Sequence, residues 1–444
     1  MKIVIAGAGE VGTHLAKLLS QENQDITLID TNLERLAAID ATCNLLTYRG
    51  SPISFNVQRD AGVERCDLFI AVTPEETSNV LACSIAKSIG ARKTVARIDN
   101  YEFMQQSHCE FFTRHGINAM IYPEYLAARE ILKSLERNWV RNWFELHDGE
   151  LIVVGVKIRD NARLAGMQLK QLSVDAHYFH VSAIKRNHET IIPRGDEYIH
   201  ANDIIYFTTT KDHVDELREI CGKVKNDIRK VLIMGGSRIA VRLIAIAGDK
   251  YKFRIIEQNR NRCTELSERC PDSMVIHGDA RDIDTLREEG IEEMDAFIAL
   301  TDSSETNILT SLTAKEYGVS KTIAEVENIQ FISEAESLNI GTIINKKLLA
   351  SSKIFQMLLD ADADSSKFMA LADADVAEIE VRPKSKVTKG PVKGLNLSHD
   401  MTIAGLIRDG KGMLVGGNTV IQPGDHVVVF CLSGAIHKIE RLFN

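Results

Sequence analysis

The feature that most constrains this chain is an internal repeat with a single offset of 228 residues. VIAGAGEVGTHLA at 4–16 aligns with LIMGGSRIAVRLI at 232–244, and CDLFIAVTPEETSNVL at 66–81 aligns with MDAFIALTDSSETNIL at 294–309. Further along, TVARIDN meets TIAEVEN at the same offset. A similarity that keeps one offset over about ninety residues indicates a duplicated domain, so the same fold must account for both copies.

Each copy alternates short apolar runs with segments of helical period, which is typical of β-α units around a parallel sheet. In the first copy we expect strands at 2–6, 26–29, 45–47, 68–72, 94–97 and 119–121. In the second copy we expect them at 231–234, 254–256, 274–276, 296–300, 322–325 and 342–344. Six strands with intervening helices predict an α/β fold of two Rossmann-like doubly wound domains, which bind ligands at the carboxyl ends of the strands.

A second, shorter repeat follows each copy. Residues 152–207 and 377–430 alternate strands and turns and end alike, with Asp203 matching Asp425, and helices are expected at 212–220 and 435–442. This pattern predicts a small α+β module after each larger domain. The expected domains are a first nucleotide-binding domain at 1–125, a linking helix and small module at 126–225, a second nucleotide-binding domain at 226–350, and a linker and small module at 351–444.

The connecting segments have their own patterns. Residues 126–140 and 348–359 have the period of amphipathic helices, which either pack or dimerise, or simply cover their own domain. Residues 360–375 (DADADSSKFMALADAD) predict a flexible acidic linker.

Composition excludes several classes of protein. No run approaches the roughly 20 apolar residues of a membrane helix, and the N-terminus lacks a secretory leader, so we expect a cytosolic protein. The net charge of -9 offers nucleic-acid phosphates no general attraction. The eight cysteines form no CxxC pair, which argues against zinc ribbons and disulfide scaffolds.

A dinucleotide-binding fingerprint directly follows the first predicted strand. In such a loop the glycines permit the tight turn, leave room for a pyrophosphate and let the helix approach the strand. Asp30 ends the second strand, where a carboxylate accepts hydrogen bonds from ribose hydroxyls and repels a 2′-phosphate, so NAD is favoured over NADP. The fingerprint consists of Gly7, Ala8, Gly9, Glu10, Val11 and Gly12.

The second copy has a degraded fingerprint. Ser237 stands where the pyrophosphate needs space, although its hydroxyl and the nearby Arg238 can contact phosphate. Glu257 supplies the ribose carboxylate one residue out of register, and Arg260 and Arg262 beyond it leave the selectivity open. The segment is Gly235, Gly236, Ser237, Arg238, Ile239 and Ala240.

Further polar residues are expected at the same edge of each sheet. Thr73 and Thr301 end the fourth strands, and Asn79 and Asn307 follow on the next helices. Arg97 ends the fifth strand and can contact a phosphate through two hydrogen bonds. For Thr73 the alternative is a helix N-cap.

A catalytic site is not indicated. The histidines show no HExxH or triad spacing, and no GxxxxGK[ST] loop marks an ATPase. A dehydrogenase also needs a side chain that exchanges a proton with the substrate, and the sequence offers no clear candidate for it.

Taken together, GAGEVG with Asp30, VTPEETSN, TVARIDN and the later RGDEYIHANDIIYF resemble two tandem RCK domains (regulator of conductance of potassium). The order is similar to that of the TrkA family, the cytosolic nucleotide-binding subunits of bacterial Trk potassium uptake systems. The resemblance implies a peripheral protein on the inner face of the cell membrane, which forms a dimer or tetramer ring under a potassium-translocating membrane subunit.

The resemblance also implies which residues bind the nucleotide, which would be NAD or NADH, with ATP or ADP as alternatives. Gly7 to Val11, Asp30, Ser51, Thr73 and Arg97 would line the first site. Gly235 to Ile239, Glu257, Asp279 and Thr301 would line the second. Ser51 stands where the second copy has Asp279, so we expect the two sites to differ in ligand or affinity.

We therefore expect a non-enzymatic regulatory subunit that gates its membrane partner through ligand-dependent conformational change. The competing hypotheses are an NAD-dependent oxidoreductase and a scaffold whose nucleotide folds are vestigial.

Overall fold

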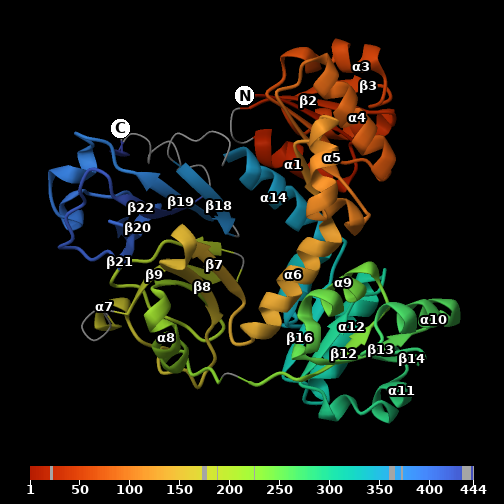
Figure 1. Ribbon diagram of the computed structural model, residues 1–444. Coiled ribbons are helices and arrows are strands. Elements are labelled where there is room, and N and C mark those ends of the chain that lie inside the picture. Colours follow the sequence, from red (N-terminus) through yellow and green to blue (C-terminus); the bar gives the residue numbers. More distant parts are fainter. Residues whose placement is uncertain are drawn as a thin grey trace. The chain divides into compact units, whose positions relative to one another are not determined.

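The chain divides into two compact units, each built from both copies of the repeat (Figure 1). The first unit contains Met1–Glu136 and Asp227–Met357, and the second contains Arg137–Asn226 and Leu358–Asn444. No helix in the described part of the chain is long and apolar enough to cross a membrane. The computed structural model describes residues 1–20, 24–172, 178–187, 189–224, 226–359, 366–371, 374–432 and 442–443.

The first domain is a six-stranded parallel sheet in the order β3-β2-β1-β4-β5-β6. The chain leaves β1 toward one edge and returns to β4 on the other side, so a cleft opens at their carboxyl ends. The strands are β1 (Lys2–Ala6), β2 (Asp25–Asp30), β3 (Leu46–Arg49), β4 (Leu68–Ala71), β5 (Lys93–Arg97) and β6 (Ala119–Ile121). The helices are α1 (Glu10–Ser20), α2 (Leu33–Asp40), α3 (Phe55–Asp60), α4 (Glu76–Ile89), α5 (Gln106–Arg114) and α6 (Pro123–Glu136).

The second domain repeats this topology as β14-β13-β12-β15-β16-β17, which confirms the predicted duplication of a doubly wound fold. Its strands are β12 (Lys230–Met234), β13 (Lys252–Glu257), β14 (Met274–His277), β15 (Ala296–Ala299), β16 (Lys321–Glu325) and β17 (Thr342–Ile344). Its helices are α9 (Arg238–Ala247), α10 (Arg260–Arg269), α11 (Ile283–Glu288), α12 (Ser304–Glu316), α13 (Ile332–Ser337) and α14 (Lys346–Leu359).

The two copies differ by one residue before their second strands. Lys2 pairs with Asp25 in the first copy, whereas the equivalent Lys230 pairs with Lys252, one position earlier than the offset requires. As a result Glu257 ends β13 where Asp30 ends β2. The register shift that the sequence showed at Glu257 is therefore a real deletion between helix and strand.

The second unit contains two five-stranded antiparallel sheets, β10-β9-β11-β8-β7 and β18-β19-β22-β20-β21. The first module has β7 (Asn142–Leu146), β8 (Leu151–Lys157), α7 (Leu169–Leu172), β9 (Phe179–Arg186), β10 (Glu189–Ile191), β11 (Ile204–Thr209) and α8 (Val214–Ile220). The second has β18 (Ser366–Leu371), β19 (Ala374–Glu380), β20 (Met401–Arg408), β21 (Lys411–Leu414) and β22 (His426–Leu432).

The predicted acidic linker at 360–375 is wrong in part. Its residues Ser366–Leu371 form β18 and pair with β19, which begins at Ala374. Backbone pairing with a neighbouring strand overrides the polar composition of the segment. Residues 360–365 and 372–373 of the linker, and most of the helix expected at 435–442, lie outside the described residues.

Matching ion pairs confirm the repeat of the small modules. Asp203 and Asp425 are both buried, and each accepts hydrogen bonds from Nε and Nη2 of an arginine, Arg186 or Arg408, at 2.7–3.0 Å. The same guanidinium groups also donate to the carbonyls of Tyr198 and Val420. Each pair ties the end of β9 or β20, where the arginine lies, to the residue that precedes β11 or β22.

The two larger domains exchange helices (Figure 1). α6 leaves the first domain and packs against α9, and its buried Ala127, Ile131 and Leu135 belong to the hydrophobic core of the second domain. In the other direction α14 contacts α1, where the Ser351 hydroxyl donates to the carbonyl of Val11. The predicted amphipathic helices thus join the two copies, and α6 does not merely cover its own domain.

Two ion pairs join the exchanged helices to the opposite domains. The acidic and basic positions of one pair are interchanged in the other. Lys347 Nζ on α14 lies 2.6 Å from Glu10 Oε2 on α1, and Arg238 Nη2 on α9 lies 3.0 Å from Glu124 Oε1 on α6. The repeat aligns Glu10 with Arg238, and Glu124 and Lys347 are both the second residue of their helix. If two first domains exchanged helices with each other, Glu10 would meet Glu124 and the two carboxylates would repel. The charges therefore favour the pairing of a first domain with a second domain.

We predict that Arg238→Glu lowers the melting temperature of the chain by several degrees, because it puts a second carboxylate beside Glu124, whose side chain is 3% exposed. Adding Glu124→Gln should restore most of the loss by removing the repulsion. Thermal unfolding is the measurement, with the exposed Arg59→Glu on α3 as the charge-matched control. Equal effects of Arg238→Glu and Arg59→Glu would show that the pair does not hold the domains.

A second prediction concerns pH. Burial alone would raise the pKa of Asp425, but hydrogen bonds from Arg408 and from the N–H of Gln422 outweigh it and the pKa lies below its usual value. The ion pair therefore stabilises the fold above the unfolded pKa of about 3.9 and is lost as pH falls through the lower folded value.

Accordingly, Asp425→Asn should lower the melting temperature by a few degrees at pH 7, and the difference from wild type should shrink below about pH 4. The control is Asp409→Asn at an exposed turn, which should have little effect at any pH. A difference that stays constant down to pH 3.5 would contradict the assignment.

Candidate functional site

The fingerprint loop after β1 shows three glycines with different roles. Gly7 has φ +112°, and a Cβ on it would approach the backbone nitrogen of Thr73 to 3.0 Å. A Cβ on Gly12 would lie 1.9 Å from the carbonyl oxygen of Gly7. Gly9 differs, because a Cβ there would meet no described atom within 4 Å. Two glycines are therefore required by the fold, and Gly9 leaves open space at the start of α1.

Asp30 fixes this loop. Its Oδ2 accepts a hydrogen bond of 2.6 Å from the N–H of Ala8, and its Oδ1 accepts one of 2.7 Å from the N–H of Asn32. The carboxylate is 9% exposed, so it is held rigidly at the edge of the cleft. Each carboxylate oxygen keeps another lone pair, which a ribose hydroxyl can use.

Asn79 holds the opposite wall of the first cleft. Its Oδ1 accepts from the N–H and the hydroxyl of Thr73, at 2.9 and 2.7 Å, and its Nδ2 donates to the carbonyls of Thr73 and Arg97. These bonds use the whole amide, so Asn79 positions the strand ends. The N-cap alternative for Thr73 is wrong, since Glu75 is the N-cap residue of α4.

Arg97 lies at the end of β5 beside this network. Its Nη2 is 3.1 Å from Asp99 Oδ1, and its side chain is 20% exposed. Its buried Nε has no hydrogen-bond partner among the described residues, so one strong donor stays available. Ser51 follows β3 at a half-buried position, next to Gly50, whose N–H donates to the carbonyl of Asp30.

The second cleft repeats the same geometry with different side chains. Glu257 Oε2 accepts from the N–H of Gly236 at 2.7 Å, and its Oε1 accepts from the N–H of Asn259 at 2.8 Å. Gly235 has φ +92°, like Gly7. Ser237 takes the place of Gly9 and caps α9, because its hydroxyl oxygen accepts from the N–H of Ala240. The longer Glu257 thus replaces Asp30 without changing the bonds.

The network of the fourth strand is also repeated. Asn307 Oδ1 accepts from the N–H and hydroxyl of Thr301, and its Nδ2 donates to the carbonyls of Thr301 and Glu325. Beyond β14, Arg281 binds both oxygens of Asp279 and holds its pKa at about 2. Asp279 is therefore charged at neutral pH and already paired, unlike Ser51 in the first copy.

Several predicted site residues face the interior of the protein. Ala8, Val11 and Ile239 are buried, so only their backbone groups can serve a ligand. Glu10 and Arg238 point to the exchanged helices, and Arg238 also lies 3.8 Å from Asp99. The structure thus brings the predicted residues together in two clefts but assigns these two charges to the domain contact.

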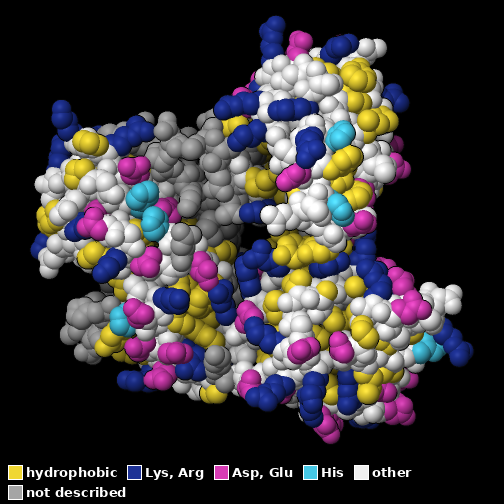
Figure 2. Space-filling view, viewed as in Figure 1, with side chains coloured by type: hydrophobic (Ala, Val, Ile, Leu, Met, Phe, Trp, Pro, Cys, Tyr) yellow, Lys and Arg dark blue, Asp and Glu magenta, His cyan; other side chains and the backbone are white. Residues whose placement is uncertain are grey.

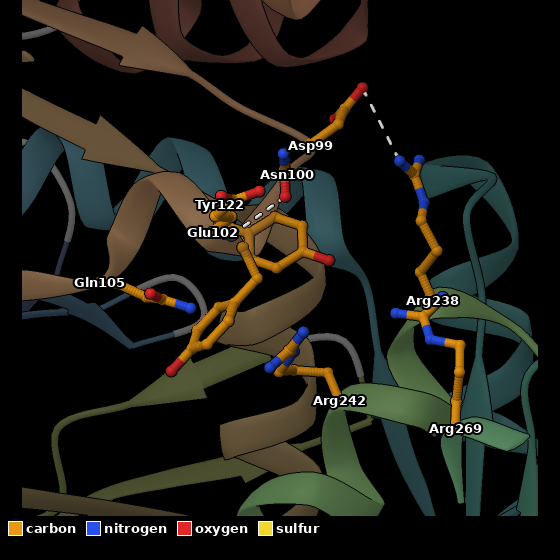
Figure 3. A pocket seen from close by; sticks show the side chains of 9 residues that line it. Asp99, Asn100, Glu102, Gln105, Tyr122, Arg238, Arg242 and Arg269 are labelled. Atoms are coloured by element: carbon orange, nitrogen blue, oxygen red, sulfur yellow. Dashed lines mark hydrogen bonds and ion pairs between the residues drawn. The ribbon is translucent and has the colours of Figure 1, made fainter. Parts of the chain in front are cut away.

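A further cleft of about 530 Å³ lies between the two domains of the first unit (Figure 3). Arg238, Arg242 and Arg269 line it from the second domain, facing acidic and aromatic side chains of the first. The Arg242 guanidinium lies 3.6 Å from the centroid of the Tyr101 ring. Arg242 is not among the residues predicted from the sequence, although a lone arginine in the apolar run of α9 was a signal. The other lining residues are Asp99, Asn100, Glu102, Gln105 and Tyr122.

Comparisons with known proteins agree with this architecture. The TrkA-N domain family matches residues 3–123 and 231–346, and the TrkA-C domain family matches residues 153–222 and 376–444. The chain is 30% identical to the Trk system potassium uptake protein TrkA of Halomonas elongata, over 100% of this chain and 98% of that protein. It is 29% identical to the TrkA homolog of Archaeoglobus fulgidus, over the full length of both.

Solved structures share the fold at low sequence identity. The GsuK RCK domain aligns with a TM-score of 0.61 and 15% identity, over 100% of this chain and 94% of that one. The GsuK channel bound to NAD aligns with a TM-score of 0.61 and 16% identity, over 100% of this chain and 78% of that one. Because the family matches cover both copies of both domains, the chain belongs to the TrkA family of Trk system potassium uptake proteins.

Proposed function

We propose that this chain is a nucleotide-binding regulatory subunit that gates a separate potassium-translocating membrane protein from its inner face. The observation that carries the proposal is that the helix beginning at each cleft forms an ion pair with the other domain. Glu10 and Arg238 begin the helices whose N-termini face the clefts, and they bind Lys347 and Glu124 on the exchanged helices. A ligand that moves either helix start therefore changes the contact between the domains.

The proposed ligand of the first cleft is NAD or NADH. The open space at Gly9 and the first-turn N–H groups of α1, which a helix leaves without intrahelical partners, suit a pyrophosphate, and Asp30 suits an unphosphorylated ribose. The name of a solved relative, the GsuK channel bound to NAD, supports this choice, and another GsuK structure was solved with ADP. We propose a different affinity for the second cleft, where Ser237 fills the space beside α9.

The proposed mechanism is a shift between two arrangements of the paired domains. A nucleotide shifts such an equilibrium only if it binds one arrangement more tightly than the other. Arg97 is the proposed source of this difference, because its Nε has no partner among the described residues while its Nη2 binds Asp99, which is also close to Arg238 of the second domain. In a dimer or tetramer ring the shift would be transmitted to the membrane subunit.

We predict that Gly9→Ala weakens NADH binding to the first cleft at least tenfold, which corresponds to about 1.4 kcal/mol, while changing the melting temperature little. The methyl group would occupy the space left for the pyrophosphate but would clash with no described atom. Calorimetric titration with NADH, NAD, ATP and ADP is the measurement.

The matched control is Gly12→Ala in the same loop. Its Cβ would lie 1.9 Å from the Gly7 carbonyl, so this variant should lose stability as well as binding. If Gly9→Ala binds NADH as tightly as wild type, the first cleft is not the nucleotide site.

Regulation needs its own experiment. The chain is reconstituted with a Trk-type membrane subunit in liposomes, and potassium flux is measured with and without NADH. We expect NADH to change the flux with wild-type chain and not with Gly9→Ala. A flux that responds equally with both chains would contradict regulation through this cleft.

A further inference from the structure

A cluster of two histidines and one glutamate lies in the second unit, far in sequence from the nucleotide clefts. One ligand atom each of His147, Glu378 and His426 lies within 4.8 Å of the other two. Glu378 Oε1 is 3.2 Å from His147 Nδ1 and 3.3 Å from His426 Nδ1. The two imidazole rings have centroids 5.4 Å apart. Figure 2 shows histidine and acidic side chains side by side on the visible face of this unit.

The two sheets of the small modules build this cluster together. Glu378 on β19 pairs with Val428, and His426 on β22 pairs with Glu380, so Glu378 and His426 are diagonal neighbours on one face of the sheet. That face carries Val376, Val428 and Phe430 into a core shared with the first module. His147 comes from the first module, directly after Leu146 of the same core, and has φ 48°.

The carboxylate of Glu378 is incompletely satisfied. The side chain is 4% exposed, and Oε2 has no hydrogen-bond partner within the described parts of the chain. A buried carboxylate oxygen without a partner is costly, because it loses its hydrogen bonds to water and gains none in the protein. One oxygen of this carboxylate is therefore unsatisfied while the other contacts two imidazole nitrogens, and a cation bound here would satisfy it.

The cluster is not part of the repeated architecture. The N–H of Ile158 donates to the carbonyl of Asp203 just as the N–H of Val381 donates to that of Asp425, which aligns the modules. On this alignment the first module has Gly155 where the second has Glu378, and Ile204 where the second has His426. Only the second module carries a carboxylate and an imidazole at these two positions, so the first module folds without them.

We propose that His147, Glu378 and His426 bind a divalent transition-metal ion, Zn²⁺ in particular. Two imidazoles and one carboxylate are a common ligand set for zinc, with a fourth position left for water. The imidazoles are partly exposed, at 32% and 38%, which gives the ion access from solvent. Because the ligands come from both small modules, the ion would clamp their two sheets together.

The test uses the full chain after removal of metals with a chelator. Zn²⁺ binding is followed by calorimetry and by elemental analysis of the dialysed protein, and the melting temperature is measured with and without Zn²⁺. We expect His426→Gln to bind one equivalent less than wild type, with a smaller rise of the melting temperature, since a ligand stabilises the state that it binds. The control is His399→Gln, at an exposed position of the same module, which should match wild type.

Glu378→Gln separates loss of binding from loss of fold. It keeps the shape of the side chain and removes the buried charge, so its metal-free melting temperature should equal or exceed that of wild type. Like His426→Gln, the Glu378→Gln variant should nevertheless bind one equivalent of Zn²⁺ less than wild type. Co²⁺ bound in place of Zn²⁺ should show a spectrum without thiolate charge transfer, because no cysteine belongs to the cluster. Equal Zn²⁺ stoichiometry in wild type, His426→Gln and Glu378→Gln would overturn the proposal and leave a hydrogen-bonded cluster only.

Discussion

The pairing of unlike copies is the constraint on which the rest of the first unit depends. α6 places Glu124 against the second domain, where its nearly inaccessible carboxylate requires the guanidinium of Arg238. Once this contact forms, the start of α9 is tied to the first domain, and Lys347 ties the start of α1 to the second. The helices at both proposed nucleotide clefts are thus anchored on the opposite copy, and the cleft lined by Arg242 lies between the two domains.

The clefts themselves depend on a simpler interaction. A carboxylate at the end of the second strand accepts from the N–H of the residue after the first glycine, and this bond occurs with Asp30 and with Glu257. It survives the one-residue deletion because the deletion lies before the strand, so Glu257 still ends β13 where Asp30 ends β2. The turn geometry is therefore kept in both copies, while the space beside the helix is open at Gly9 and filled at Ser237.

Much of the fold could be predicted from periodicity and from the repeat, because buried parallel strands have apolar runs that local sequence reveals. The places of Gly7, Gly12 and Asp30 in the loop could be predicted for the same reason, since the backbone geometry requires them locally, and their role in ligand binding stays a prediction. Arg242 and the cluster of Glu378 were missed, because Tyr101 and His147 come from the other copy and no local sequence pattern indicates these contacts. The acidic linker failed because β18 depends on pairing with β19.

The sequence by itself determined the duplication, the doubly wound class and the position of the fingerprint loops, since these follow from short-range spacing of glycines, acids and apolar residues. Only the tertiary structure decided how the copies combine. It assigned Glu10 and Arg238 to the contact between domains and brought His147 to Glu378 across 231 positions of the chain. The physical reason is that charge pairing and burial act between surfaces in space, and a single sequence does not show which surfaces meet.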